Sequence, residues 1–190
     1  CWTSDNTDPL DRIHIQSGTS YGYPQSVMTM HVAAAISFPD FRHSSIEQRF
    51  NVSAFGLLGY ELDVTNLSKF DRAAVKKQIE YYKQHRRLLQ YGEFSRIGDI
   101  ETDDRCMWQI TSEDKTEAMY GYFVNRITPN WGNDVIKFVS LNSDWDYELN
   151  IRTQLLSVKN FGDMINVPLP KKMKKLVKSS YTSFKNKPHI

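Results

Sequence analysis

The feature that most constrains the fold of this 190-residue chain is a change in hydrophobic periodicity near residue 93. Before that point, apolar residues follow helical spacing or form one continuous run. After it, they form short runs rich in β-branched and aromatic residues, separated by turn residues, which is the pattern of antiparallel sheets. The sequence therefore predicts an α/β part over residues 1–92, followed by an all-β domain over residues 93–190.

The first part alternates predicted strands and helices. The apolar run 28–36 suits a strand buried on both faces, as in a parallel sheet, and 37–50 resembles a loop at the sheet edge. A second short strand is predicted over 59–63. A helix then begins after Ser68 and ends at Gly92. This order predicts the last part of a (β/α)8 TIM barrel.

The second part contains four predicted strands that would form an antiparallel β-sandwich, incomplete within this chain. They are 106–110, 118–124, 135–139 and 147–151. Tryptophans fall in or near these runs at Trp108, Trp131 and Trp145. Two interpretations are open. The three rings could stack on a sugar, or Trp108 could belong to the core while the other two pack at strand edges.

The charge of the chain does not call for a nucleic-acid partner or a membrane. Its 24 Lys and Arg against 22 Asp and Glu give a net charge of only +2. The basic residues on the predicted helix favour a solvated face over a binding patch. They are Lys76, Lys77, Lys83 and Arg87. A Lys-rich segment over 171–187 could bind phosphate, but its aromatic residues are too sparse to favour nucleic acid.

Other features of the composition point to a globular protein of a reducing compartment. No apolar run approaches the roughly 20 residues of a membrane span. The two cysteines, Cys1 and Cys106, are too few for a disulfide framework. The predicted location is therefore cytoplasmic. His31, inside the first apolar run, is interpreted as a structural histidine of the core or barrel rim rather than as a catalytic one.

The opening stretch is expected to be a strand end at Cys1 and Trp2, followed by a polar loop and a helix start. Asp8 is a good N-cap, Pro9 then falls at the first helical position, and Gly18 suits a helix end. Asp5 lies on the loop in front of this helix, at the edge where α/β proteins bind ligands and carry out catalysis. From spacing alone, capping of the same helix is the favoured interpretation of Asp5, ahead of a catalytic role.

The same stretch resembles the α-galactosidases of glycoside hydrolase family 36. The residues WTSDNTD followed by DRIHIQSGTS are close to the family pattern, and matches continue in register to about Asp163. They include Tyr23-Pro24, Met28, His31-Val32, Arg49, Asn51-Val52, Phe55-Gly56, Gly59 to Asp63, Gln90 to Gly92, Ser112 to Lys115, and Phe161 to Asp163. The resemblance implies that Asp5 is the general acid/base and contacts the substrate.

The resemblance also implies parts that this sequence lacks. The family nucleophile lies in a Lys-Trp-Asp-Met-Asn-type segment and a sugar-binding loop reads Cys-Ser-Gly-Gly, and neither occurs here. We therefore expect the chain to be the C-terminal portion of a longer enzyme, and inactive by itself. The implied activity is retaining hydrolysis of terminal α-galactosyl groups from melibiose- and raffinose-type oligosaccharides, with no metal and no organic cofactor.

The resemblance also implies an oligomeric state, and two rival functions stay open. By resemblance the enzyme is a homo-oligomer, namely a tetramer. The rival functions are a non-catalytic carbohydrate-binding or assembly module, in which Asp5 merely caps a helix, and a weaker one, a nucleic-acid binder acting through the basic tail.

Overall fold

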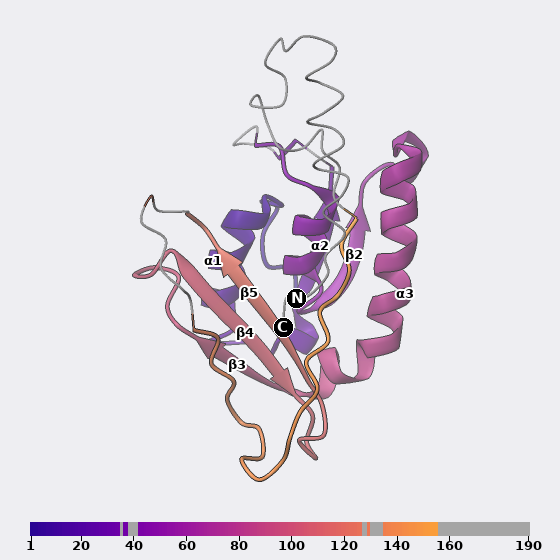
Figure 1. The fold of residues 1–190 in the computed structure, drawn as a ribbon. Helices are drawn as coiled ribbons and strands as arrows, with labels where there is room; N and C mark the ends of the chain where they lie inside the picture. The colour runs from indigo at the N-terminus through magenta and orange to yellow at the C-terminus, as the bar shows by residue number, and fades with distance from the viewer. Residues whose placement is uncertain (35, 38–41, 127–128, 130–134, 156–190) are drawn as a thin grey trace. The chain divides into compact units, whose positions relative to one another are not determined.

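The computed structural model describes residues 1–34, 36–37, 42–126, 129 and 135–155 (Figure 1). The contacts divide the chain into two units, Cys1–Tyr147 and Glu148–Ile190. Among the described residues, the helices and strands all belong to the first unit. In chain order they are α1 (Pro9–Thr19), η1 (Gln25–Val27), β1 (Thr29–Ala33), α2 (Ile46–Ser53), β2 (Leu57–Glu61), η2 (Val64–Asn66), α3 (Lys69–Tyr91), β3 (Glu93–Ile97), β4 (Arg105–Thr111) and β5 (Ala118–Val124).

Helix α1 begins as predicted but ends differently. The Asp8 side chain accepts hydrogen bonds from two amides of the first turn, at 2.9 and 3.3 Å, and Pro9 occupies the first helical position. Gly18 does not end the helix, because α1 continues through Thr19. Its C-cap, Ser20, has right-handed helical angles (φ −68°), so no left-handed residue is needed there. The predicted strand end at Cys1 and Trp2 is also wrong, since these residues form no strand.

Strands β1 and β2 pair in parallel, as the continuous apolar run indicated. His31 lies opposite Gly59 in the register, and Ala33 lies opposite Glu61. Met30 on β1 is fully buried, in agreement with a strand covered on both faces. The strand is shorter than the run, since β1 spans only Thr29–Ala33.

The predicted loop over 37–50 is wrong in its last part, where helix α2 begins at Ile46. Ser45 caps this helix by accepting from the amide of Gln48 at 3.1 Å. Ile46 and Phe50, one turn apart, are only 2% and 1% exposed. Two turns give too short a helical period to stand out from a loop in the sequence. Strand β2 accordingly begins at Leu57, before the predicted 59–63.

Helix α3 confirms its prediction at both ends. Ser68 caps it by accepting from the amide of Asp71 at 3.0 Å, and Gly92 follows its last residue. The residues it buries share one face: Ala74, Val75, Gln78, Tyr82, Leu88 and Leu89. The predicted basic face is exposed at Lys76, Lys77, Lys83 and Arg87. The long helical period therefore predicted both the helix and its solvated side.

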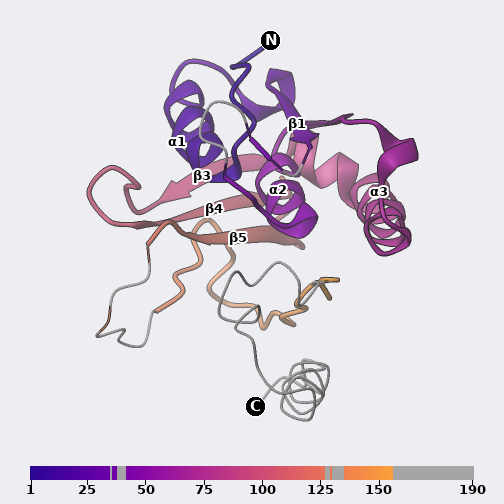
Figure 2. The same ribbon diagram turned by 90° about the horizontal axis from the view of Figure 1, so that it is seen from above.

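The pairing changes from parallel to antiparallel after α3, which confirms the predicted change of secondary structure near residue 93. Strands β3, β4 and β5 form one antiparallel sheet in that order, and α1 and α2 lie on one side of it (Figure 2). Trp108 on β4 is 1% exposed. Its ring centroid lies 5.5 Å from Phe55 and 4.7 Å from Phe123. Trp108 is thus a core residue and not part of a sugar platform.

The two later predicted strands, 135–139 and 147–151, are wrong. Both segments are described and neither is a strand. Their apolar side chains are exposed, with Val135 at 74% and Ile151 at 75%. The backbone of Val139 bonds instead to a side chain: its N–H donates to Oε1 of Gln109 at 3.0 Å, and its carbonyl accepts from Nε2 of Gln109. The backbone at Val139 is therefore bonded by a buried side-chain amide of β4 and not by strand pairing.

The predictions for the other two tryptophans and for the Lys-rich segment have different outcomes. Trp145 is 47% exposed beside Tyr147, with ring centroids 6.4 Å apart, and does not lie at a strand edge. Trp131 and the Lys-rich 171–187 lie outside the described residues. Among the helices that the structure describes, none is long and apolar enough to cross a membrane.

Candidate active site

The acidic loop in front of α1 places Asp5 in solvent, free of the helix cap. Asp5 is exposed, and its Oδ1 accepts a hydrogen bond from the indole Nε1–H of Trp2 at 2.7 Å. The cap of α1 is Asp8, which is fully buried. Capping therefore does not explain Asp5, and this removes the structural alternative that spacing left open.

The loop is ordered by short-range hydrogen bonds. The amide of Asn6 donates to Oγ of Ser4 at 3.0 Å, and its side-chain amide donates to Oδ2 of Asp11 at 2.7 Å. In return, Oδ1 of Asn6 accepts from the amide of Asp8 at 3.0 Å. These bonds tie the residue after Asp5 to the first turn of the helix, so the loop has a defined conformation.

Arg12 connects the loop that carries Asp5 to strand β1. Its side chain is 2% exposed, and its guanidinium donates to the carbonyls of Ser4 at 3.2 Å, Asn6 at 3.5 Å and Thr29 at 3.1 Å. Burial lowers the pKa of Arg12, and the charge of Glu61 partly opposes this. The sequence reading gave this arginine no role. Its spacing from Pro9, Ile13 and Gln16 places it on the buried face of α1.

Arg42 neutralises the buried cap. Its guanidinium pairs with Oδ1 of Asp8, and it lies 3.7 Å from Oδ1 of Asp11. Asp8 therefore has a structural role on two counts, as an N-cap and as the partner of an arginine. Arg42 precedes α2, so its contact with Asp8 brings that part of the chain next to the loop that carries Asp5. The sequence predicted that residues 37–50 lie at this edge of the sheet.

The ring of His31 packs against Trp2 at the same edge of the β1–β2 sheet. The two ring centroids are 4.6 Å apart with an interplanar angle of 55°. Nδ1 of His31 lies 3.2 Å from Oε2 of Glu61, the last residue of β2. His31 thus contacts Trp2 rather than Asp5, which agrees with its interpretation as a structural residue of the rim. The role of Trp2 as a donor to Asp5 was missed, because that contact depends on the loop conformation.

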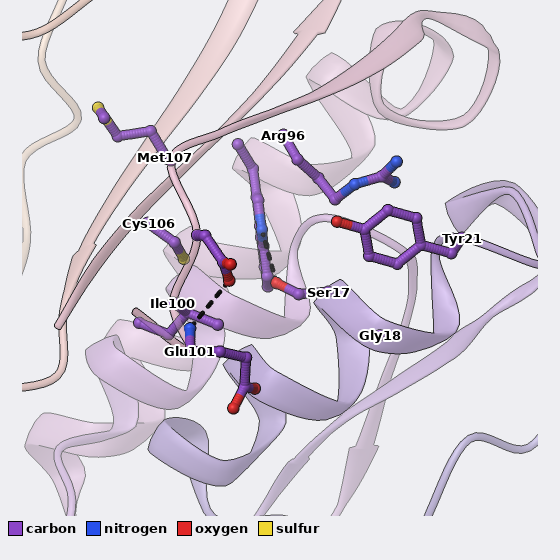
Figure 3. Close-up of a pocket in the computed structure, with 11 residues that line it drawn as sticks. Ser17, Gly18, Tyr21, Arg96, Ile100, Glu101, Cys106 and Met107 are labelled. Atoms are coloured by element: carbon purple, nitrogen blue, oxygen red, sulfur yellow. Dashed lines mark hydrogen bonds between the residues drawn. The ribbon is translucent and has the colours of Figure 1, made fainter. Parts of the chain in front are cut away.

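A small cavity at the end of α1 is too small for a sugar. It is a cavity of about 80 Å³ between the end of α1 and strands β3 and β4, lined in part by Ser17, Tyr21 and Arg96 (Figure 3). Arg96 stacks on Tyr21 with its guanidinium carbon 4.0 Å from the ring centroid, and donates to Oγ of Ser20 at 2.8 Å. Ligand pockets usually measure about 300 Å³ or more, so this cavity is a packing feature.

The donor set of the described residues offers nothing to a metal. Within that part of the chain, no three His, Cys, Asp or Glu side chains are grouped so that they could hold an ion. Asp5 can supply the chemistry of an exposed carboxyl group with an oriented N–H donor beside it. Such a group can give and take a proton.

Comparison with known proteins agrees with this chemistry. Residues 1–92 match the family model described as Melibiase. The α-galactosidase AgaA of Geobacillus stearothermophilus is 38% identical over 148 residues, which are 78% of this chain and 20% of that protein. Alpha-galactosidase 1 of Pediococcus pentosaceus is 39% identical over 155 residues, which are 82% of this chain and 21% of that protein.

Solved structures give the same result for the fold. A variant of AgaA from Geobacillus stearothermophilus in complex with raffinose superposes with a TM-score of 0.74 at 36% identity, covering 76% of this chain and 20% of that one. The α-galactosidase from Lactobacillus brevis gives 0.71 at 38% identity, covering 73% and 19%.

The fold and the loop place the chain among the glycoside hydrolases. It belongs to the α-galactosidases of glycoside hydrolase family 36, as the sequence resemblance implied. The chain spans about a fifth of the length of the curated relatives that it matches.

Proposed function

We propose that this chain supplies the general acid/base of a retaining α-galactosidase, and that Asp5 is this residue. The observation that supports the proposal is the environment of Asp5, whose carboxyl is exposed, is not used as a helix cap, and accepts an N–H from Trp2 at 2.7 Å. The family resemblance implies the same role for the aspartate of the WTSDNTD segment. The substrates would be melibiose- and raffinose-type oligosaccharides, since a related enzyme binds raffinose.

In the proposed reaction Asp5 acts twice. In the first step it donates a proton to the glycosidic oxygen while a second carboxylate attacks the anomeric carbon, giving a galactosyl-enzyme. In the second step Asp5 removes a proton from the water that hydrolyses this intermediate. Retaining glycosidases keep the two carboxyl groups about 5–5.5 Å apart. The second carboxylate would come from the Lys-Trp-Asp-type segment of the family, which is absent from this sequence.

The finer architecture and setting are part of the same proposal. Strands β1 and β2 with α2 and α3 would be the last part of a (β/α)8 barrel over 1–92. The sheet β3–β4–β5 would belong to a β-sandwich domain over 93–190. The enzyme would be a cytoplasmic homo-tetramer. These features follow from the family resemblance and from the change from parallel to antiparallel pairing.

The stereochemistry of the product tests the proposed function. In the full-length protein, hydrolysis of melibiose followed by proton NMR should give α-galactose first, with the β-anomer appearing later through mutarotation. First appearance of the β-anomer would contradict the retaining mechanism. Binding of melibiose without any hydrolysis would instead support the rival function, a non-catalytic carbohydrate-binding module.

A further inference from the structure

Three residues from three segments converge beside Asp5. Trp2 comes from the chain start, His31 from the middle of β1, and Glu61 from the end of β2. We call them the Trp2 cluster. Trp2 is 56% exposed, so burial alone does not fix the orientation of its indole. The contacts with its neighbours must do so.

The first contact is the one that Trp2 makes with the carboxyl group. Its Nε1–H donates to Oδ1 of Asp5 at 2.7 Å. An N–H bond to a carboxylate at this length is in the range of charge-assisted hydrogen bonds. Because Oδ1 accepts this bond, the other oxygen, Oδ2, is left to carry a transferable proton. The indole thus distinguishes the two oxygens of Asp5.

The second contact holds the indole. The ring of His31 packs on Trp2 with centroids 4.6 Å apart, and Nδ1 of His31 lies 3.2 Å from Oε2 of Glu61. Parallel pairing of β1 with β2 explains how His31 and Glu61 meet. His31 is opposite Gly59 in the register, and Glu61 is two residues later on the same face of β2.

Gly59 leaves the space for the histidine ring. A Cβ at this position would lie 2.9 Å from Cδ2 and 3.3 Å from Nε2 of His31. The ring therefore packs against β2 at Gly59, where a larger residue would displace it. The side chain of His31 is 17% exposed, so strand β2 and the indole cover most of it.

From this geometry we propose that Trp2 is a positioning residue for the proton transfer by Asp5, and that His31 and Glu61 hold Trp2 in that position. The inference rests on the proposed function of Asp5. Trp2 fixes the carboxyl group so that Oδ2 faces the leaving oxygen, and His31 prevents the indole from turning its N–H away. None of the three cluster residues takes up or releases a proton in this scheme.

A comparison of leaving groups in the full-length enzyme tests the proposal. Trp2→Phe keeps the ring and removes the N–H donor. For melibiose, whose leaving group needs protonation, kcat/KM should fall about 10-fold, less than the ~10²–10⁴-fold of a lost acid/base. For 4-nitrophenyl α-galactoside, which needs little acid assistance, kcat/KM should change less than about 2-fold. Trp145→Phe, at an exposed tryptophan away from the loop, is the matched control and should affect neither substrate.

A double-mutant cycle tests the role of His31. His31→Ala should show the same loss for melibiose alone, and the double variant should lose no more than Trp2→Phe, because both changes remove one interaction. Equal losses on both substrates, or additive losses, would overturn the proposal. Asp5→Asn measured in parallel separates the two claims: if it shows no dependence on the leaving group, the role of Asp5 itself fails.

A spectroscopic measurement on the full-length protein tests the geometry without any activity. In the ¹⁵N-tryptophan-labelled protein, the indole resonance absent from Trp2→Phe belongs to Trp2. Asp5→Ala and His31→Ala should both move this resonance and leave that of Trp145 unchanged. A Trp2 resonance that moves with neither substitution would contradict the contact.

Discussion

At the scale of single residues, two carboxyl groups three positions apart are separated by their environments. Asp8 is fully buried, caps α1 and pairs with Arg42. Asp5 is exposed and accepts from Trp2. Sequence spacing predicted the cap correctly, because capping depends only on nearby residues. It could not predict the Trp2 contact or the three carbonyls that Arg12 binds, because these depend on how the loop folds over β1.

The two carboxyl groups should differ in their effect on stability. Asp8→Ala removes the cap and leaves Arg42 without its partner, so the free energy of unfolding should fall by about 1–2 kcal/mol or more. Asp5→Ala should change it by less than about 0.5 kcal/mol, as expected for an exposed residue. Urea denaturation of the two variants measures both values. The reverse order would show that Asp5, not Asp8, is the cap.

The two cysteines should differ in reactivity. Cys1 is exposed and Cys106 is buried, and burial raises the pKa of the Cys106 thiol to about 12. We expect a thiol reagent at pH 8 to modify Cys1 rapidly and Cys106 only after unfolding. Fast modification of both in the native protein, counted by mass spectrometry, would contradict the packing around β4.

The same thiol makes stability depend on pH in the alkaline range. An unfolded cysteine loses its proton near the ordinary value of 9.0, whereas folded Cys106 keeps it to about 12. The folded state therefore binds more protons than the unfolded state between these values. The contribution of Cys106 to stability is complete below pH 9 and is lost as the pH rises toward 12.

At the scale of elements, prediction succeeded for one long helix and for two strands of the β3–β4–β5 sheet, and it failed for a short helix and for two runs without a partner strand. Helix α3 and strands β4 and β5 were predicted closely. Helix α2 was missed because two turns resemble a loop. The runs 135–139 and 147–151 were predicted as strands from composition, but a strand also needs a partner edge and a surface to cover it, which a local pattern does not encode.

The contact between β5 and Phe55, two residues before β2, can be tested at Gly121. A Cβ there would lie 2.7 Å from two ring carbons of Phe55 and 2.9 Å from Phe123. Gly121→Ala should therefore lower the free energy of unfolding by about 1–3 kcal/mol through overpacking. Gly18→Ala is the matched control. It lies inside α1 with no atom within 4 Å of the added Cβ, and should be neutral or stabilising by up to about 1 kcal/mol. Equal effects of the two substitutions would contradict this packing.

At the scale of the whole molecule, the proposed mechanism assigns to this chain one of the two carboxyl groups that a retaining glycosidase requires. It spans about a fifth of the length of its curated relatives. We expect the pure 190-residue chain to hydrolyse no 4-nitrophenyl α-galactoside, because the family nucleophile segment is absent from the sequence. Turnover by this chain alone, measured after removal of any contaminating glycosidase, would contradict the assigned roles.

In the complete enzyme, substitution of Asp5 tests the proposed acid/base role. Asp5→Asn keeps the size of the side chain and an oxygen that can accept from Trp2, so folding should persist. It removes the proton that the leaving group needs and the base that activates water. Hydrolysis of melibiose should then fall by roughly 10²–10⁴-fold. An activated aryl galactoside should still react in the first step.

The most direct test is azide rescue of Asp5→Asn in the full-length enzyme with 4-nitrophenyl α-galactoside. The account predicts a burst of nitrophenol as the galactosyl-enzyme accumulates, followed by a slow phase. Azide, which attacks without help from a base, should accelerate the slow phase and give α-galactosyl azide, with the configuration retained. Near-normal hydrolysis of melibiose by Asp5→Asn, with no effect of azide, would contradict the assignment of Asp5 as the acid/base.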